Sequence, residues 1–585
     1  MVLFAASVLV LIAAAMFVGW GWAFLKLFRL GLRDWARTAV IGMAALVCIG
    51  GILNLARLAY PSALAAIAGT GLVLAVFAWR EGFEGSSSWL AIAVSAAIVI
   101  FTIATQLPPS IYNFHDDFQK YLAYPVRMVE TGTVFGSPLS AMGLQTLGAQ
   151  AFLHGFVVAF FPIIYINGVD AVLGLFLCLM LATRFAKGWI AAACVLAVVV
   201  INPQYVNIST LYLGSALMMA MVAESFDESP SAVALGLLAA ALVAMKPIYL
   251  IFVAIHFVLV GFVEIEGIKN GLRWIVRAGI AAGIFLSPWV VMHAPNYLAS
   301  KHHTTRPTPA PDAEDTDAIN LVSFEPLEYG ATAVNYTALV ASFAICGVIC
   351  RSSRKMIASC ASAVAAFFVF VYVLGPMNYG YNHALRYYVP VAIAVAPAVF
   401  GFAASYARSL WVPIAVVAIA LVAFAPSAWT RATAAVKLHT VASYSWLVED
   451  PEYVDYNRRV LFGTEKQDVA SLQNRVPAGE RILAWMDTPF YLDYRRNKIF
   501  DIDTAGIAVP WAEVPPAGYL IWDYGGFATP DRADFEGRLA NTGANERRDS
   551  ALTLDFIKRL DGMVGSGKVL YDDGEVMLVK LAGKE

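Results

Sequence analysis

The chain has few charged residues. Only 14% of its 585 residues are Asp, Glu, Lys or Arg, whereas 59% are hydrophobic, and the mean hydropathy is +0.67. So little charge cannot cover a globular core with polar surface, which excludes a soluble globular protein and predicts a polytopic membrane protein. A large excess of one charge is also lacking, because the net charge is −2. Nothing therefore indicates a nucleic-acid partner, and membrane lipids are the expected surroundings.

Cysteine is lacking from the polar segments. The six cysteines all lie in apolar stretches, where a free thiol is typically a small core side chain: Cys48, Cys178, Cys194, Cys346, Cys350 and Cys360. The first apolar stretch, from Val2 to Phe24, lacks a basic start and a small-residue cleavage site, and it is long enough to span a bilayer. It predicts a retained membrane helix and not a removed signal peptide.

Long apolar runs are abundant, and they predict an α-helical polytopic protein with about 14 transmembrane helices, each near the spanning length of roughly 20 residues. The runs are 2–24, 38–56, 61–79, 88–106, 163–183, 188–201, 209–224, 231–245, 248–263, 274–293, 333–350, 356–375, 388–405 and 410–428. Residues 1–87 form an N-terminal group of helices, 88–429 the main membrane unit with its loops, and 430–585 a polar tail.

Lys and Arg in short loops predict the orientation, because such residues are retained in the cytoplasm. They follow the odd-numbered runs: Lys26, Arg29, Arg33, Arg37, Arg80, Arg184, Lys187, Lys269, Arg273, Arg351, Arg354 and Lys355. Both termini, the loops that carry Asp116, Asn207 and Arg386, the segment 294–332 and the tail are then outside. A bacterial inner membrane with a periplasmic tail fits this topology.

Three outer regions are more than connectors. Residues 111–162 combine amphipathic spacing around 118–130 with a second helix near 149–161, and both are expected along the membrane surface. The segment 295–329, with Lys301, His302, His303 and Arg306, has the composition of a mobile loop and is a candidate lid. In the tail, strands at 481–485, 498–502 and 519–522, a helix near 552–562 and a hairpin at 569–580 predict a small α/β domain.

Two adjacent carboxylates, Asp116 and Asp117, follow the apolar run that ends at Gln106. Charge at a membrane boundary costs free energy and commonly marks function. With His115 before the pair and Tyr121 after it, with Lys246-Pro247 at a helix end, and with Asn378-Tyr379-Gly380-Tyr381 leading to Arg386-Tyr387-Tyr388-Val389-Pro390, the chain resembles the GT-C superfamily of integral-membrane glycosyltransferases.

The resemblance implies that a sugar, a hexose or a pentose, moves from a polyprenyl-phosphate carrier to an envelope glycan, lipid or protein on the outer membrane face. It covers residues 88–430, and the tail only in a general sense. In familiar members the carboxylate loop follows the first span, whereas here it follows the fourth, so that either three extra helices precede it or the register of the comparison differs. No cofactor is required, although a divalent cation at Asp116 and Asp117 is an option.

The residues themselves support this chemistry, because displacing a phosphate from an anomeric carbon needs a base on the attacking hydroxyl and cations on the departing phosphate. Asp116 or Asp117 is the expected base, with Asp116 preferred. Arg386 and Lys246 are the expected phosphate ligands. Five further residues are expected to contribute to binding of the substrate or the lipid phosphate: Tyr387, Tyr381, His115, Lys301 and His302. One direct displacement predicts inversion at the anomeric centre.

Each residue also has a simpler interpretation. The two aspartates are favoured residues at a helix start. Arg386 and Lys246 can extend to lipid headgroups without binding a substrate. His115 fits either a metal ligand or a hydrogen-bonding partner of Asp116, and the residues at 301–306 fit a solvated loop as well as a lid.

Three other functions remain open on the sequence. An envelope polysaccharide polymerase or ligase would depend on His302 or His303 more than on Asp116. A lipid-linked-sugar transporter or flippase would distribute charged residues through its spans, and commonly shows two similar helical halves. A non-catalytic relative would use the tail to bind partners.

Overall fold

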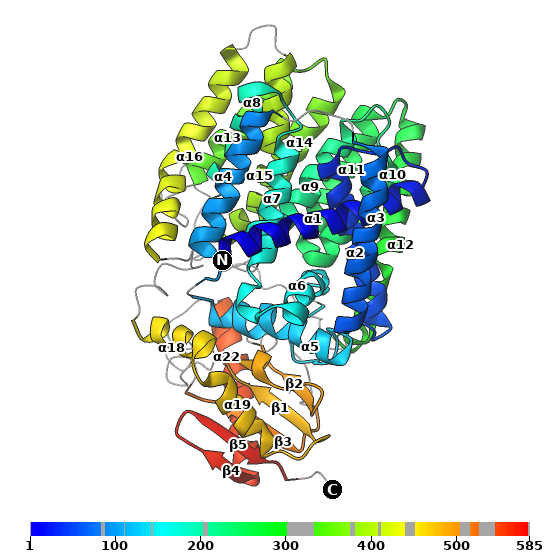
Figure 1. Cartoon of the computed structure of the whole chain (residues 1–585). Helices are drawn as coiled ribbons and strands as arrows, with labels where there is room; N and C mark the ends of the chain where they lie inside the picture. The colour runs from blue at the N-terminus through cyan, green and yellow to red at the C-terminus, as the bar shows by residue number, and fades with distance from the viewer. Residues whose placement is uncertain are drawn as a thin grey trace.

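The computed structural model describes residues 2–83, 88–109, 111–140, 142–143, 146–202, 209–300, 333–374, 381–406, 411–438, 451–503, 515–525 and 544–582. The protein is mostly helical and has a helix bundle and a tail that contains one sheet (Figure 1). Between bundle and tail lie the π-helix η1 (Phe114–Leu122), α5 (Ala123–Thr131) and α6 (Ala149–Phe160). The predicted class, a helical membrane protein with a small C-terminal α/β unit, is confirmed at this level.

The bundle contains the apolar helices that the sequence predicts. Their bounds are α1 (Val2–Leu27), α2 (Trp35–Leu55), α3 (Pro61–Glu81), α4 (Trp89–Gln106), η2 (Ile163–Tyr165), η3 (Val169–Gly174), α7 (Leu175–Ala182), α8 (Gly188–Val200), α9 (Tyr212–Ser225), α10 (Ala232–Met245), η4 (Pro247–Tyr249), α11 (Leu250–Leu259), η5 (Val260–Glu264), α12 (Ile268–Ser300), α13 (Ala333–Ile349), α14 (Arg354–Phe368), η7 (Val369–Leu374), α15 (Tyr381–Tyr406) and α16 (Trp411–Leu438).

Among the described residues, nine helical stretches are long and apolar enough to cross a membrane, so fourteen spans are not confirmed. The difference comes largely from short helices. α8, α9 and α10 have 13, 14 and 14 residues, and at 1.5 Å per residue such helices fall short of a hydrocarbon core of about 30 Å. α10 ends at Lys246 because Pro247 disfavours helical backbone at the residue before it, and Lys246 is extended.

Apolar side chains are exposed along the outer surface of the bundle. On α12 they recur every four residues, which places one stripe on the outside of the helix: Ile268, Leu272, Val276, Ile280 and Ile284. A contiguous apolar stripe of this length is unfavourable in water. This surface supports a membrane location for the bundle.

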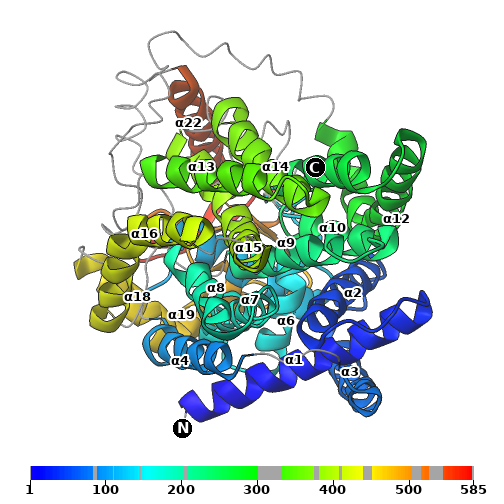
Figure 2. The ribbon, with the colours of Figure 1, turned by 90° about the horizontal axis from the view of Figure 1, so that it is seen from above.

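The three N-terminal helices form one edge of the bundle. Seen from above, α1 runs along that edge with α3 outside it (Figure 2). α2 lies inside, where it packs against α9, α10 and α12. Glycines let these helices approach closely, since a Cβ at Gly42 would lie 1.7 Å from the backbone oxygen of Phe17. The helices are therefore an integral layer of the bundle.

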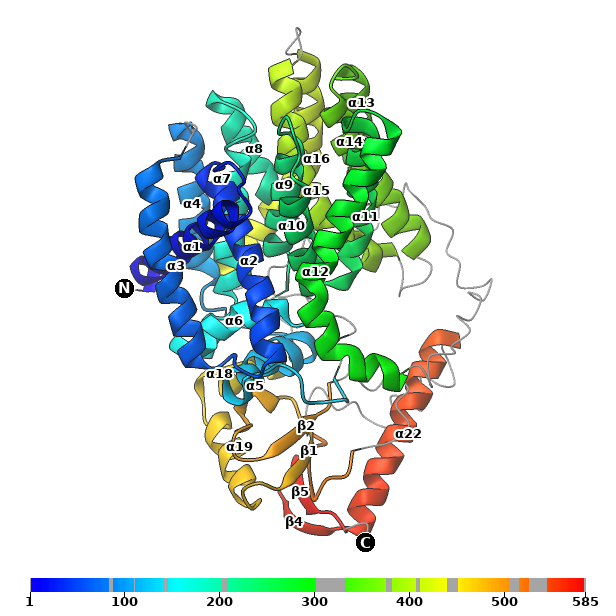
Figure 3. The ribbon, with the colours of Figure 1, turned by 90° about the vertical axis from the view of Figure 1, so that its right-hand side faces the viewer.

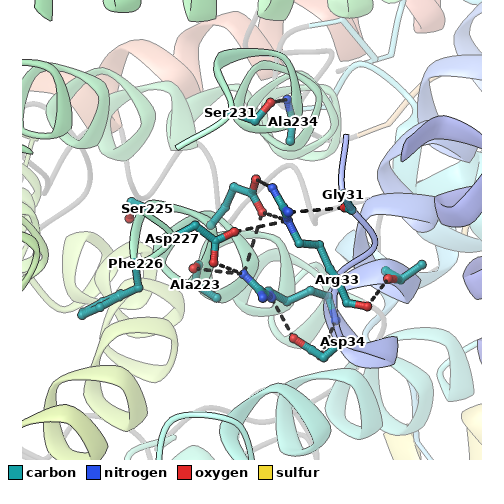
Figure 4. A network of polar contacts seen from close by, with 12 residues as sticks. Gly31, Arg33, Asp34, Ala223, Ser225, Phe226, Asp227, Ser231 and Ala234 are labelled. Atoms are coloured by element: carbon teal, nitrogen blue, oxygen red, sulfur yellow. Dashed lines mark hydrogen bonds and ion pairs between the residues drawn. The ribbon is translucent and has the colours of Figure 1, made fainter. Parts of the chain in front are cut away.

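Basic residues predicted to share one side of the membrane do gather at one end of the bundle. Arg33 holds Glu224 through two bonds, Nη2–Oε1 at 2.7 Å and Nε–Oε2 at 3.1 Å, and it also contacts Asp227 (Figure 4). Arg184 reaches Asp34 at 3.5 Å. Because Asp34 caps the start of α2, whereas the residues after α2 contact Gly132 near the tail, this network lies at the end away from the tail. Which compartment it faces stays a prediction.

The tail is an α/β unit close to the predicted one. Its elements are α18 (Pro451–Phe462), α19 (Glu465–Asn474), β1 (Arg481–Trp485), η8 (Pro489–Tyr491), β2 (Lys498–Asp501), β3 (Tyr519–Asp523), α22 (Ala544–Ser566), β4 (Lys568–Asp572) and β5 (Val576–Lys580). The sheet order is β2-β1-β3-β5-β4. β1 is parallel to β2 and β3, and the β4–β5 hairpin extends the sheet in antiparallel fashion.

Strand alternation gives the sheet two buried faces. Leu483 and Trp485 of β1 belong to one apolar cluster with side chains of α22, the helix that lies beside the sheet in Figure 3. Ile482 and Ala484 lie on the opposite face, in one apolar cluster with α18, α19 and the segment around Phe118. The strand β1 is therefore covered on both sides.

That second cluster joins the tail to η1 and α5. Phe118 is fully buried, and its ring lies 5.5 Å from the ring of Phe490 and 6.4 Å from that of Tyr456. That the 118–130 helix lies along the membrane surface stays a prediction, but the segment is not a free-standing helix. The tail covers its outward side, and Lys120 and Arg127 are buried.

We expect Phe118→Ala to destabilise the protein by about 3–5 kcal/mol, because a fully buried ring is lost and a cavity is left between tail and bundle. Thermal unfolding of the purified protein in detergent, together with proteolytic release of the tail, measures this. The matched control is Phe462→Ala at an exposed tail position, which should change stability by less than about 0.5 kcal/mol. Equal effects of the two variants would contradict the shared core.

Candidate functional site

The π-helix η1 carries both predicted carboxylates. The loop before it is held by the tail: the side chain of Asn457 accepts a bond from the backbone N–H of Tyr112 at 2.8 Å, and the hydroxyl of Tyr453 accepts one from that of Phe114 at 3.0 Å. Helices with i→i+5 bonds are rare and are frequent at functional sites. The two adjacent aspartates have different surroundings in this helix, because Asp116 is half-exposed and Asp117 is buried.

Asp117 is fully buried and points back along its own segment. Its Oδ2 accepts a bond from the backbone N–H of Asn113 at 2.9 Å. Burial raises the pKa of the Tyr453 phenol, and the charge of Asp117 raises it further. These contacts assign Asp117 to the structure of the loop, as expected for a residue that caps a helix start.

Asp116 has a different environment. Its side chain is 49% exposed and pairs with the ammonium group of Lys120 at 2.8 Å. Lys120 is one helical turn further on and nearly buried, and burial alone would lower its pKa. The carboxylates of Asp116 and Asp503 outweigh burial, so the pKa of Lys120 is raised. Lys120 therefore stays protonated and is the cation that faces Asp116.

Lys246 lies at the break between α10 and η4. Its Nζ sits over the ring of Tyr387 at 4.8 Å from the centroid, a distance at which a cation is attracted by the ring face. The charges of Arg386, Asp116, Lys120 and Asp170 all act on this ammonium group. Residues of α10, α15 and η1 thus converge on one place at the inner side of the tail.

Tyrosines complete this cluster. Tyr121, on η1, is partly buried, and burial together with Asp116 raises its pKa well above the usual range. Tyr387 and Tyr249 also act on Tyr121. At neutral pH the phenol of Tyr121 therefore remains protonated, so it is available as a hydrogen-bond donor. The cluster therefore combines one half-exposed carboxylate, three cations and several hydroxyl groups.

The remaining predicted site residues lie outside this description. Lys301 and His302, with the rest of the candidate lid, fall outside the described residues. For His115 and Tyr381 the structure places the backbone, in η1 and at the start of α15, but their side chains are not among those described. Their roles stay predictions.

Sequence reasoning missed Asp170, on η3. It is fully buried, and its carboxylate accepts bonds from the backbone N–H groups of Leu211, Tyr212 and Leu213 at 2.8–3.2 Å. These N–H groups begin α9, where a negative charge is stabilised by the helix dipole. A signal was present, because an aspartate within an apolar run is rare in membrane proteins.

The tail residues of the site were also missed. Asp503, just beyond β2, accepts a bond from the hydroxyl of Tyr124 at 2.7 Å, and Asp501 binds the guanidinium of Arg127. The same guanidinium lies 4.7 Å from the ring centroid of Tyr494. No pattern in the sequence relates residues of the tail to η1 or α5, so these pairs required the structure.

The structure adds no support for a metal ion at the aspartate pair. In the part of the chain that is described, no group of three or more His, Cys, Asp or Glu side chains is arranged to hold one. A separate cavity of about 610 Å³ lies on the tail between α18, α19 and the β4–β5 hairpin, and carboxylates such as Glu465, Asp523 and Glu575 line it. Burial and neighbouring carboxylates raise the pKa of Asp523.

Comparison with models of protein families and with curated proteins finds no match to this chain. The fold and the site geometry therefore carry the functional argument.

We expect Arg127→Leu to lower stability by about 3–5 kcal/mol, because it leaves the carboxylate of Asp501 buried without its cation. The Arg127 and Asp501 side chains are only 5% and 4% exposed. Thermal unfolding checks this, with Arg458→Leu as the control, since the pair between Arg458 and Asp455 is exposed on the tail surface and should contribute little. The double variant Arg127→Leu, Asp501→Leu should recover part of the lost stability. A double variant no more stable than Arg127→Leu would argue against an uncompensated charge.

Proposed function

We propose that the protein is a GT-C-type glycosyltransferase that moves a sugar from a polyprenyl-phosphate carrier to an acceptor of the cell envelope. The observation that carries the proposal is the convergence of Asp116 and Arg386 on Lys246: the three are distant in sequence, and the charges of Asp116 and Arg386 both act on the Lys246 ammonium group. A base candidate and two cations at one place are what the transfer requires.

The reaction is a single displacement at the anomeric carbon. Asp116 takes the proton of the acceptor hydroxyl while that oxygen forms a bond to the carbon. The bond from the carbon to the phosphate oxygen breaks, and its electron pair leaves with the polyprenyl phosphate. The configuration at the anomeric carbon is therefore inverted. Asp116 suits the base better than Asp117, because its side chain is half-exposed and Asp117 is buried in the loop.

Arg386 and Lys246 stabilise the negative charge that grows on the departing phosphate. Arg386 offers a planar set of donors, and Lys246 offers a compact charge. The ring of Tyr387 beneath Lys246 limits the directions in which the ammonium group points. In a site shielded from water, such fixed charges act more strongly than in solution.

The topology of the proposal follows from the basic end of the bundle. If that end is cytoplasmic, the tail and the cluster around Asp116 lie outside. The protein is then a multi-pass protein of a bacterial inner membrane with both termini extracytoplasmic, and the tail is periplasmic. The lipid-linked donor reaches the site from the outer leaflet.

We expect Asp116→Asn to abolish the surface glycan in the native host, with transfer at least about 100-fold slower, because a general base contributes roughly that factor or more. The carboxylate of Asp116 is half-exposed, so the protein level should be unchanged. Asp117→Asn should instead lower the protein level, since it replaces one oxygen of a fully buried, hydrogen-bonded carboxylate with an amide donor. Analysis of surface glycan and immunoblots measure both. Unchanged glycan in the Asp116→Asn strain rejects the assignment of the base.

We expect Arg386→Gln and Lys246→Gln each to weaken binding of polyprenyl monophosphate about tenfold or more, because a charge-assisted hydrogen bond contributes roughly 1.5–3 kcal/mol. Titration of the lipid into the purified protein in nanodiscs, followed by native mass spectrometry, measures the affinity. Arg458→Gln, on the tail surface, is the control and should bind as the wild type does. Wild-type affinity in both site variants would contradict a phosphate site here.

A further inference from the structure

The tail supplies a carboxylate to the cluster around Asp116. Asp503 follows β2, and its side chain is almost fully buried between tail and bundle. One oxygen accepts a bond from Tyr124 at 2.7 Å, and the charge of Asp503 also acts on Lys120. The ammonium group of Lys120 is at the same time paired with Asp116 at 2.8 Å. Lys120 is thus paired with a carboxylate of η1 and also lies within the electrostatic influence of one from the tail.

We propose that Asp503 is a positioning residue, through which the docked tail sets how strongly Lys120 holds Asp116. This inference rests on the proposed function, in which Asp116 is the base. It gives the tail a part in the chemistry, beyond covering η1.

The physical reason is competition for one cation. A buried lysine that faces a single carboxylate stabilises its ionised form strongly and so makes that carboxylate a poor base. A second carboxylate near the same ammonium group offsets part of that stabilisation, because its negative charge disfavours a second ionised carboxylate nearby. Asp116 then keeps a higher affinity for the proton of the acceptor, which favours proton transfer near neutral pH.

Tyr124 fixes the second carboxylate in place. Burial and Asp503 raise the pKa of Tyr124 well above the usual range, so its hydroxyl remains a donor near neutral pH. Because Tyr124 belongs to α5 and Asp503 to the tail, this bond also ties the position of Asp503 to the docking of the tail. Displacement of the tail would remove the competing charge.

Other ionisable groups also act on this part of the site, and they stay unchanged when residue 503 is altered. From η1, η3, α10, η4 and α15 they are Asp117, Tyr121, Asp170, Lys246, Tyr249, Arg386 and Tyr387. Neutralising Asp503 therefore changes one charge in a fixed surrounding. Its effect on the pH dependence of the reaction has a defined sign.

A purely structural role for Asp503 makes a different prediction. The neighbouring pair of Asp501 and Arg127 joins tail and bundle by a buried ion pair, and Asp503 might be thought only to strengthen the same joint. In that case its loss would lower stability and rate together and leave the pH profile where it was.

The test compares Asp503→Asn with the wild type in nanodiscs, with polyprenyl-phosphate sugars extracted from the native host as donors and host envelope as acceptor. Release of polyprenyl phosphate is followed against pH. We expect kcat to fall about threefold to tenfold with an unchanged KM for the donor, because the base becomes weaker. The acid limb of the profile should move to lower pH by about one unit, since Lys120 then acts on Asp116 alone.

Two variants serve as controls. Asp503→Glu keeps the charge and should restore the position of the acid limb. Asp555→Asn removes an exposed carboxylate of α22, where it pairs with Arg559, and should behave as the wild type does. Thermal unfolding of each variant separates loss of fold from loss of rate.

The outcomes separate the inference from the function on which it rests. If the wild type releases polyprenyl phosphate, Asp116→Asn does not, and Asp503→Asn keeps the wild-type pH profile, the role of Asp503 is rejected and the proposed function stands. A wild type no more active than Asp116→Asn rejects the proposed function, and the role of Asp503 with it. A shifted acid limb that Asp503→Glu restores supports both.

Discussion

Buried charge between the tail and the helix bundle is the constraint on which the rest of the structure depends. Lys120 and Arg127 lie on one short segment and are both nearly inaccessible to water. An unpaired charge in such a place costs several kcal/mol, so each needs a carboxylate held at the right position. Asp116 can serve Lys120 from the same helix, but Arg127 is matched by Asp501 of the tail. The segment is therefore complete only with the tail in place.

The apolar contacts around these charges have the same consequence. Phe118 packs among tail side chains, and the hydroxyl of Tyr453 bonds to the backbone on either side of Asn113. Apolar burial gives this joint its stability, whereas the ion pairs and hydrogen bonds fix its register. A site built on η1 can then be held in one geometry, which an isolated membrane-surface helix would not provide.

The sequence predicted the secondary-structure elements well, but it did not predict which elements pack against one another. Every apolar run became a helix where it is described, and β1 occupies the predicted residues, because hydrophobic periodicity is a local property. The convergence of Asp116, Lys246 and Arg386 was also anticipated, since each stands beside an apolar run on the same predicted side. The number of membrane spans was not anticipated, because α8, α9 and α10 are apolar but too short to cross a membrane. Composition does not show where a helix stops within a bundle. Asp501 and Asp503 were missed because contacts between tail and bundle leave no mark on spacing.

The short helices and the buried charges are related. The helix α10 stops at Lys246, where the backbone is extended. The ammonium group of Lys246 lies where the charge of Arg386 acts on it. Irregular backbone at such a depth is tolerated only where protein or a polar cavity surrounds it. The charges of Arg386 and Lys120 disfavour the charged form of Lys246, whereas those of Asp116 and Asp170 favour it. An anionic group beside Lys246 and Arg386 would reduce the repulsion between these two cations, and the phosphate of the proposed lipid donor would be such a group.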